Sequence, residues 1–197
     1  MTAPDRFATI AAALLVDTDP HADPGARTTR RPEPTSSTAQ LLAGLFEDVM
    51  WVGGAPLWEA PGRQVDSTEG PGPLGGLASA LCATRAERVL VLGDGLPQPS
   101  VDLCLALVAW PEADVVAPRA ARGGPLFALY RRTPTLDCAR RLLADGRSDP
   151  AELHDALECE ILEAADLACV DPEAAAFAGS RDDGPQRSRS PGATSST

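Results

Sequence analysis

Two short segments of the chain combine residue types that could do chemistry on a phosphorylated ligand. The first is the run GPGPLGGL at residues 70–77, whose glycines allow the backbone to approach a ligand closely. The amide groups at the start of a helix can point at an anion or at the edge of a ring. Taken alone, the run is a glycine-rich turn before a helix, so its meaning depends on what accompanies it.

The second segment is an apolar run at residues 89–92 that is followed by Gly93 and Asp94. One carboxylate at the carboxyl end of a strand is well suited to hold a magnesium ion beside a triphosphate, because magnesium prefers oxygen ligands. A lone aspartate after a strand is more often a turn residue or a helix cap. The order and spacing of the neighbouring segments must decide between these two interpretations.

An acidic group follows the first apolar run of the sequence. Asp17, Asp19, His21 and Asp23 could chelate a metal ion as a loop cluster, although a solvated acidic loop is the simpler interpretation. Since only His21 and His154 offer imidazole, the sequence supports no zinc assignment.

Arginines flank the apolar run at residues 126–130. They are Arg119, Arg122, Arg131 and Arg132. These side chains are either solvated charges at the ends of a strand or a surface that holds the phosphate of an anionic substrate. The sequence leaves both interpretations open.

Length, charge and composition limit the class of protein. The chain has 197 residues, the size of one α/β domain. Its formal net charge of −11 argues against a nucleic-acid binder, because such proteins neutralise phosphates with clustered basic residues. All 17 basic residues are arginine, so a mechanism that needs lysine would have to use arginine here. The expected partners are therefore small molecules or proteins.

Apolar runs and cysteines indicate the compartment. The longest apolar run, at residues 10–16, is far shorter than the roughly 20 residues of a membrane helix, so no membrane partner is expected. The five cysteines are widely spaced and form no C-x-x-C pair. This pattern indicates thiols in a reducing compartment rather than a disulfide framework, and we expect a cytoplasmic protein.

Hydrophobic periodicity predicts strands that alternate with helices. The expected strands are residues 7–16, 50–52, 88–92, 114–117, 126–130 and 167–170. The expected helices run from Ser37 or Thr38 to about residue 48 and then cover residues 74–84, 101–109, 136–145 and 151–163. Ser100 is predicted to cap the helix at residues 101–109.

This alternation predicts an α/β fold with one three-layer, mostly parallel sheet and helices on both faces. Ligands of such sheets lie at the carboxyl ends of the strands, so chemistry is expected in the loops after Val16, Val52 and Leu92. The domain should cover residues 1–178. Residues 179–197 are too polar to bury a core and are expected to form a disordered tail.

Several segments occur in an order that is informative as a set. They are LLAGL at residues 41–45, Val65-Asp66, GPLGGL at 72–77, GDGLP at 93–97, ADVVAP at 113–118, PLFALY at 125–130 and DPEAAAF at 171–177. In this order they resemble the molybdenum cofactor guanylyltransferase family. The resemblance implies a Rossmann-like nucleotidyltransferase fold of the nucleotide-sugar-transferase type.

The resemblance also implies a reaction, in which GMP is transferred from GTP to the terminal phosphate of the molybdopterin cofactor and pyrophosphate is released. It implies that Asp94 is catalytic and holds Mg²⁺. The nucleotide-binding residues that it implies, together with arginines that could offset the phosphate charge, are Asp66, Gly72, Pro73, Leu74, Gly75, Gly76, Arg27, Arg30 and Arg31. Molybdoenzymes or their chaperones are candidate protein partners.

Two segments depart from the pattern of that family. Its phosphate-binding loop, Gly-Gly-x-Ser-x-Arg-Met-Gly followed by lysine, corresponds here to residues 16–27, where three carboxylates and two prolines stand. Carboxylates repel a triphosphate, and proline lacks the N–H group that a phosphate cradle uses. The family's Asn-x-Asn-Thr-Pro element is replaced by Ala-Gly-Ser-Arg-Asp at residues 178–182.

These departures leave alternatives open. The chain could be a non-catalytic relative that binds a nucleotide, the cofactor or a molybdoenzyme partner without turnover. It could also be a related transferase that uses CTP or another phosphorylated acceptor.

Overall fold

The computed structural model describes residues 9–16, 33–53, 61–93, 96, 98–110, 112–118 and 126–171. For residues 33–36 and 164 it describes the backbone alone. The predicted tail at residues 179–197 and most of the predicted loop after the first strand lie outside these ranges. The extent predicted for the domain therefore stays a prediction.

Within the described residues, seven strands form one sheet in the order β3-β2-β1-β4-β6-β5-β7. The strands are β1 (Ile10–Leu15), β2 (Asp48–Val52), β3 (Arg63–Val65), β4 (Arg88–Gly93), β5 (Val115–Pro118), β6 (Phe127–Arg131) and β7 (Cys159–Leu162). β6 runs antiparallel to its neighbours β4 and β5, and the other pairs are parallel. The sheet is therefore mostly parallel with one reversed strand.

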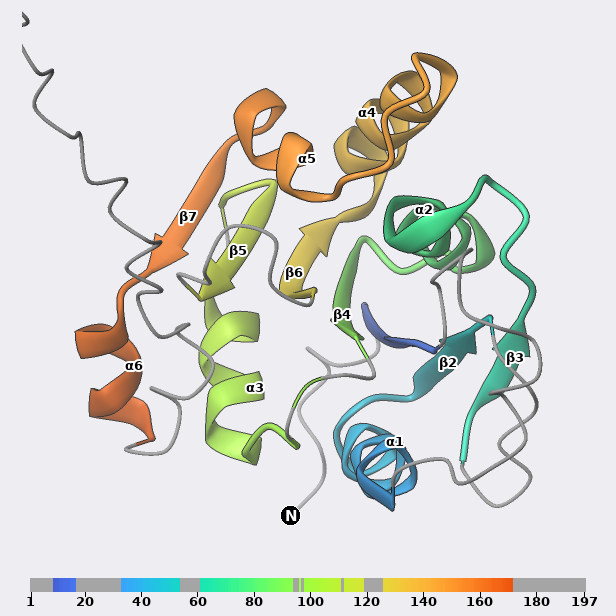
Figure 1. Cartoon of the computed structure of the whole chain (residues 1–197). Helices are drawn as coiled ribbons and strands as arrows, with labels where there is room; N and C mark the ends of the chain where they lie inside the picture. The colour runs from blue at the N-terminus through green and yellow to red at the C-terminus, as the bar shows by residue number, and fades with distance from the viewer. Residues whose placement is uncertain are drawn as a thin grey trace, which may run out of the picture.

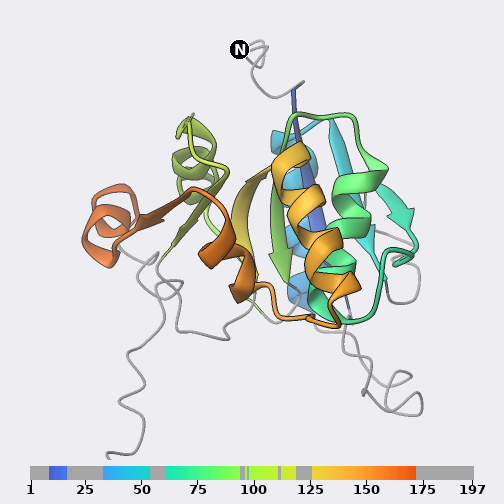
Figure 2. The ribbon, with the colours of Figure 1, turned by 90° about the horizontal axis from the view of Figure 1, so that it is seen from above.

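Helices cover both faces of this sheet (Figures 1 and 2). They are α1 (Glu33–Leu45), α2 (Gly72–Ala83), α3 (Val101–Ala109), α4 (Arg132–Ala144), α5 (Ala151–Ala156) and α6 (Ala164–Val170). Buried residues of α2, α4 and α5 share one core with the sheet, and those of α1, α3 and α6 share the other. The α/β class and the three layers predicted from the sequence are thus confirmed.

β1 shows why the sequence folds in this way. All six of its residues are buried. Ala11, Ala13 and Leu15 belong to the core under α2, and the alternate residues Ile10 and Leu14 belong to the core on the other face. A strand covered on both sides has no place for a polar residue, which is why the run is continuously apolar.

Two predictions near the end of the chain are wrong. The helix expected at residues 151–163 ends at Ala156, and Cys159–Leu162 is instead the edge strand β7. The strand expected at residues 167–170 lies within α6. Leu153, Leu157 and Ile161 recur at helical spacing, but the parallel pairing of β7 with β5 outweighs that local pattern.

Smaller differences concern the limits of the first elements. α1 begins at Glu33 and ends at Leu45, so the helix predicted from Ser37 or Thr38 to residue 48 starts and ends too late. The short strand β3 was not predicted, because its three residues are largely exposed and carry no apolar alternation. The Ser100 cap is confirmed, since its hydroxyl oxygen accepts a hydrogen bond from the amide of Leu103 at 3.1 Å.

Across the described residues, every helix is too short or too polar to cross a membrane.

Candidate functional site

The carboxyl ends of β1, β2, β3 and β4 meet at one edge of the sheet, because these strands are parallel. Backbone hydrogen bonds continue the sheet past the ends of the strands. The amide of Val16 donates to the carbonyl of Val52 at 2.9 Å, and the amide of Gly53 donates to the carbonyl of Val65 at 3.1 Å. Since ligands of open α/β sheets bind at this edge, it is the place to look for a site.

Gly53 brings the chain after β2 close to the end of β1. Its φ is +79°, in the left-handed region, and a Cβ atom there would lie 2.7 Å from the carbonyl oxygen of Val16. Only glycine fits both the conformation and the contact. A glycine is therefore required at position 53, where the chain leaves β2 and passes close to Val16.

The glycine-rich turn begins α2 at the same edge. Pro71 is the N-cap residue, Gly72 has φ +72°, and Pro73 stands in the first turn. Among the described residues no side chain caps this end of α2, and its first turn contains no acidic residue. The backbone amides of the first turn have no acceptor within the helix, and the positive end of the helix dipole meets no carboxylate from that turn.

Two predicted nucleotide-binding elements are brought together here. Asp66 directly follows β3 and is exposed, and the loop that starts with it leads into the first turn of α2. Within the turn, Pro73 is exposed, whereas Gly72, Gly75 and Gly76 are buried. Leu74 is 0% exposed and packs into the core, so its side chain cannot contact a ligand.

The remaining predicted site residues lie outside the described residues. They are Asp94, Arg27, Arg30 and Arg31, together with Asp17, Asp19, His21, Asp23, Arg119 and Arg122. Gly93, the last residue of β4, ends at the carboxyl edge, where its amide donates to the carbonyl of Leu126 at 2.7 Å. Within the described part of the chain, no three residues of the His, Cys, Asp and Glu types gather as a possible metal site.

Residues that the sequence did not single out hold the loop at residues 66–71. The hydroxyl oxygen of Ser79 accepts hydrogen bonds from the amides of Thr68 at 3.0 Å and Glu69 at 3.1 Å. The same hydroxyl donates to the carbonyl of Gly75 at 2.8 Å. At Gly75, an added Cβ would lie 2.0 Å from the carbonyl oxygen of Gly70, so the loop rests directly on the helix backbone.

An ion pair ties the loop to α4. Arg140 donates from Nε and from Nη2 to the two carboxylate oxygens of Glu69, each at 2.7 Å. The hydrogen bonds from Arg140 hold the pKa of Glu69 below its ordinary value. These residues are 71 positions apart, so sequence reasoning had no signal for the pair. For Ser79 the one available signal was its helical spacing from Gly75.

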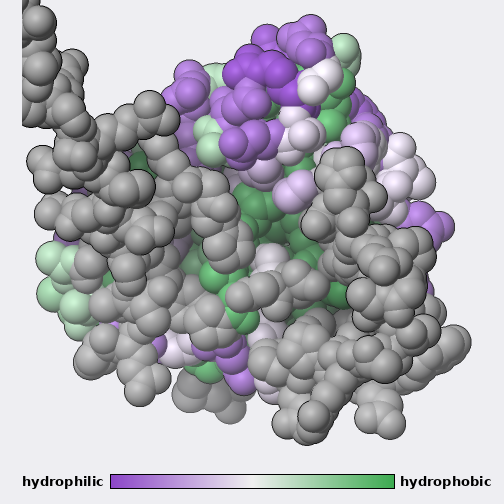
Figure 3. All heavy atoms as spheres, in the orientation of Figure 1, coloured by the Kyte–Doolittle hydropathy of each residue, from purple (hydrophilic) through white to green (hydrophobic). Residues whose placement is uncertain are grey.

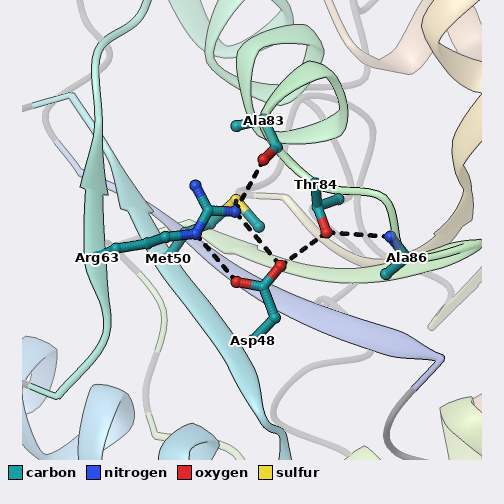
Figure 4. A network of polar contacts seen from close by, with 6 residues as sticks. All are labelled: Asp48, Met50, Arg63, Ala83, Thr84 and Ala86. Carbon is teal, nitrogen blue, oxygen red and sulfur yellow. Dashed lines mark hydrogen bonds and ion pairs between the residues drawn. The ribbon is translucent and has the colours of Figure 1, made fainter.

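The amino-terminal edge of the sheet, opposite the carboxyl edge, has a different kind of polar network (Figure 4). Arg63 donates from Nε and Nη2 to the carboxylate of Asp48 at 3.1 and 3.3 Å, and from Nη2 to the carbonyl of Ala83 at 2.9 Å. The hydroxyl of Thr84 donates to Asp48 at 2.7 Å and accepts from the amide of Ala86 at 3.1 Å. This network anchors the carboxyl end of α2 to the first residues of β2 and β3.

The arginines that follow β6 also lie at this opposite edge. Arg131 is paired with Arg88, the first residue of β4, in the sheet register. Its guanidinium contacts the carboxylate of Asp114 at 3.2 Å, and Nε of Arg132 donates to the carbonyl of Leu81 at 3.0 Å. The hypothesis that Arg131 and Arg132 hold a substrate phosphate is therefore wrong, because both side chains brace the fold away from the carboxyl edge.

The cysteines are free thiols. Cys104 and Cys138 are buried, Cys159 is half-buried, and Cys82 and Cys169 are exposed. Burial raises the pKa of Cys104 to about 12 and that of Cys159 to about 11. These two thiols therefore stay protonated at neutral pH and are poor nucleophiles or metal ligands.

The surface at the carboxyl edge is partly apolar. Figure 3, in the orientation of Figure 1, shows hydrophobic surface at the centre of the view, where β4 ends and β6 begins, below the hydrophilic surface of α4 and α5. An apolar area beside the start of a helix is a surface on which a flat ring can lie with its edge hydrogen-bonded.

No protein-family model matches the chain, and no curated protein sequence does. Among solved structures, the chain is similar to molybdopterin-guanine dinucleotide biosynthesis protein A from Archaeoglobus fulgidus, with a TM-score of 0.61 and 17% identity over 85% of this chain and 90% of the other. It is similar to 4-diphosphocytidyl-2C-methyl-D-erythritol synthase from Anaerococcus prevotii, with a TM-score of 0.57 and 12% identity over 78% and 86%.

A third similar structure is 2-C-methyl-D-erythritol 4-phosphate cytidylyltransferase from Thermus thermophilus, with a TM-score of 0.53 and 15% identity over 76% of this chain and 87% of the other. At such identities the likeness concerns the fold. The chain therefore has the α/β fold of the nucleotidyltransferases.

Proposed function

We propose that the chain is a nucleotidyltransferase that transfers GMP from GTP to the molybdopterin cofactor and releases pyrophosphate. The observation that carries this proposal is the start of α2. A helix end without a side-chain cap or a first-turn carboxylate stands at the carboxyl edge of the sheet, with Asp66 on the loop before it. The fold and the order of the seven resembling segments support the choice.

The reaction forms a bond between a phosphate oxygen of the acceptor and the α-phosphorus of GTP, while the bond from the α-phosphorus to the bridging oxygen of the β-phosphate breaks. Little covalent work falls to the protein, and its contribution is to position the two substrates and to stabilise charge. A ring edge or a phosphate oxygen would lie at the start of α2, where the helix dipole is positive. The carboxylate of Asp66 would accept hydrogen bonds from N–H or O–H groups of the nucleotide.

Magnesium is part of the proposal through Asp94. A carboxylate that follows β4 offers the oxygen ligand that this ion prefers, and Arg27, Arg30 or Arg31 would add positive charge near the phosphates. When bound, magnesium would neutralise negative charge on the phosphate groups. These four residues lie outside the described residues, so their roles rest on the resemblance alone.

A second candidate is a non-catalytic relative that binds a nucleotide, the cofactor or a molybdoenzyme partner. It is favoured by the three carboxylates Asp17, Asp19 and Asp23, which follow the first strand where the family binds phosphates. A CTP-dependent transferase is a third candidate, because two similar structures are named for cytidylyl chemistry.

Calorimetric titration with GTP, CTP and ATP in the presence of magnesium tests these candidates. The proposal expects GTP to bind most tightly, and preference for CTP would support the third candidate. Binding of none of the three would overturn a nucleotide site. If GTP binds but no GMP is transferred to molybdopterin, the second candidate, a non-catalytic relative, would be supported.

The acidic segment after β1 offers a second test. Replacing Asp17, Asp19 and Asp23 together by Asn should tighten GTP binding if this segment faces the triphosphate, because each carboxylate near a phosphate costs on the order of 1 kcal/mol. The gain should shrink as salt is added. Unchanged affinity at low ionic strength would contradict a place for this segment over the phosphates.

A further inference from the structure

We propose that Ser79 is a positioning residue of the nucleotide site. Its hydroxyl group holds the loop at residues 66–71 in the conformation that presents Asp66 and the first turn of α2 to the nucleotide. The inference rests on the proposed function for its ligand, whereas the anchoring of the loop can be measured without one.

The hydroxyl of Ser79 uses its whole hydrogen-bonding capacity. A hydroxyl group has one donor and two acceptor positions. The amides of Thr68 and Glu69 can only donate, so they occupy the two acceptor positions at 3.0 and 3.1 Å. The hydroxyl proton must then point at the carbonyl of Gly75, 2.8 Å away. Since Ser79 is 2% exposed, water has little access to replace these partners.

Two consecutive amides that converge on one oxygen fix two peptide planes of the loop. The contact at Gly75 adds a third restraint, because the carbonyl of Gly70 lies where any side chain at Gly75 would be. Asp66 is two residues before the first of these amides, and Gly72 is three residues after the second. Both ends of the predicted nucleotide-binding segment are thus held from the buried side, and the side chain of Asp66 is exposed on the other.

The opposite end of α2 supplies a matched control. The hydroxyl of Thr84 is also buried, with a residue exposure of 4%, and it also joins the helix to neighbouring elements through hydrogen bonds. Its partners lie at the amino-terminal edge of the sheet, away from the proposed site. Removing either hydroxyl costs stability, but only that of Ser79 holds the nucleotide loop.

The experiment compares Ser79→Ala with Thr84→Ala. GTP affinity is measured by calorimetry, stability by urea denaturation, and amide exchange at Thr68 and Glu69 by NMR. We expect Ser79→Ala to weaken GTP binding on the order of tenfold or more, because a misplaced binding group loses most of its effect. Thr84→Ala should lose stability and keep its affinity.

Amide exchange gives the readout that a general loss of stability would not reproduce. The amides of Thr68 and Glu69 should exchange faster in Ser79→Ala than in Thr84→Ala when both are compared at equal stability. Should Ser79→Ala fail to fold, Ser79→Cys keeps the volume of the side chain and weakens the hydrogen bonds, so it should show the same effects to a smaller degree.

Equal GTP affinity in Ser79→Ala and the unsubstituted protein would overturn the positioning role. If the unsubstituted protein binds none of the three nucleotides, the proposed function fails instead. In that case the exchange rates still decide whether Ser79 anchors the loop: faster exchange in Ser79→Ala supports the anchor, and unchanged exchange overturns it.

Discussion

The two ends of α2 are built in opposite ways. At its carboxyl end, Thr84 and the carbonyl of Ala83 are bonded to Arg63 and Asp48 from the sheet. At its start, no side chain of the described residues caps the helix, and the polar anchor at Ser79 is buried behind the loop. One end is closed by side chains that serve stability, while the other is the end that we propose to face a ligand.

The largest expected effect is that of Asp94→Asn on transfer of GMP. The change keeps size and polarity but removes the charge proposed to hold magnesium, so transfer should fall roughly 100-fold, as when other preorganised charge-stabilising groups are lost. Stability should be unchanged. Asp48→Asn, at the opposite edge, is the control and should transfer GMP at the normal rate. Full activity of Asp94→Asn would contradict the proposal that Asp94 holds magnesium.

Gly75→Ala should be the next most damaging change. Its Cβ atom would lie 2.0 Å from the carbonyl oxygen of Gly70, so the loop has to move, at a cost of about 1–3 kcal/mol in unfolding free energy and with weaker GTP binding. Gly44→Ala in α1 is the matched control, because nothing lies within 4 Å of the added atom. That variant should be as stable as the parent or slightly more stable. Urea denaturation and calorimetry would measure both effects.

Asp48→Asn should lower the unfolding free energy by about 1 kcal/mol, since the lost hydrogen bonds involve a partly exposed charge. Burial alone would raise the pKa of Asp48, but hydrogen bonds from Arg63 and Thr84 hold it below its ordinary value. A lowered folded pKa stabilises the protein fully above about pH 4, and this contribution is lost as the pH falls through the folded pKa.

The variant should therefore lose less stability than the parent when the pH is lowered below about 4. Asp137→Asn, at an exposed aspartate of α4, is the control and should keep the parent's acid sensitivity. A parallel pH dependence of Asp48→Asn and the parent would show that the network at this edge contributes little.

The smallest effect is expected for Arg140→Gln. Its guanidinium and the carboxylate of Glu69 form two short hydrogen bonds, but the side chain of Arg140 is 47% exposed, and water and salt weaken such pairs. GTP affinity should drop by less than in Ser79→Ala, and added salt should remove the difference from the parent. A drop as large as that of Ser79→Ala would mean that the exposed contact, rather than the buried hydroxyl, holds the loop.

Local sequence signals predicted much of this fold. The apolar run of β1, the Ser100 cap and the glycine-rich start of α2 are each encoded within a few residues, and each lies where the sequence indicated. β3 was missed because its residues are mostly exposed, and β7 was mistaken for helix because its identity depends on pairing with β5. Strand pairing brings together residues distant in sequence, and such pairing cannot be predicted from local hydrophobic periodicity.

For the candidate site, the sequence indicated Asp66 and the turn at Gly72, because the chemistry lies in the residue types themselves, and their roles stay predictions. Ser79 and Arg140 could not be named, because a serine inside a helix and an exposed arginine are ordinary residues until the loop is folded against them. The edge of the sheet at which Arg131 and Arg132 lie could not be predicted either, since it depends on β6 running antiparallel to β4.

The strand order has a consequence for synthesis on the ribosome. β1 to β4 lie within the first 93 residues, and they form one half of the sheet with α1 and α2 on its faces. This half can assemble before the remainder emerges, because chains tend to fold from the amino end during translation. Until β6 arrives, however, the apolar strand β4 is an open edge that invites pairing with another chain. Fragments that stop before Phe127 should therefore aggregate more readily than the whole chain.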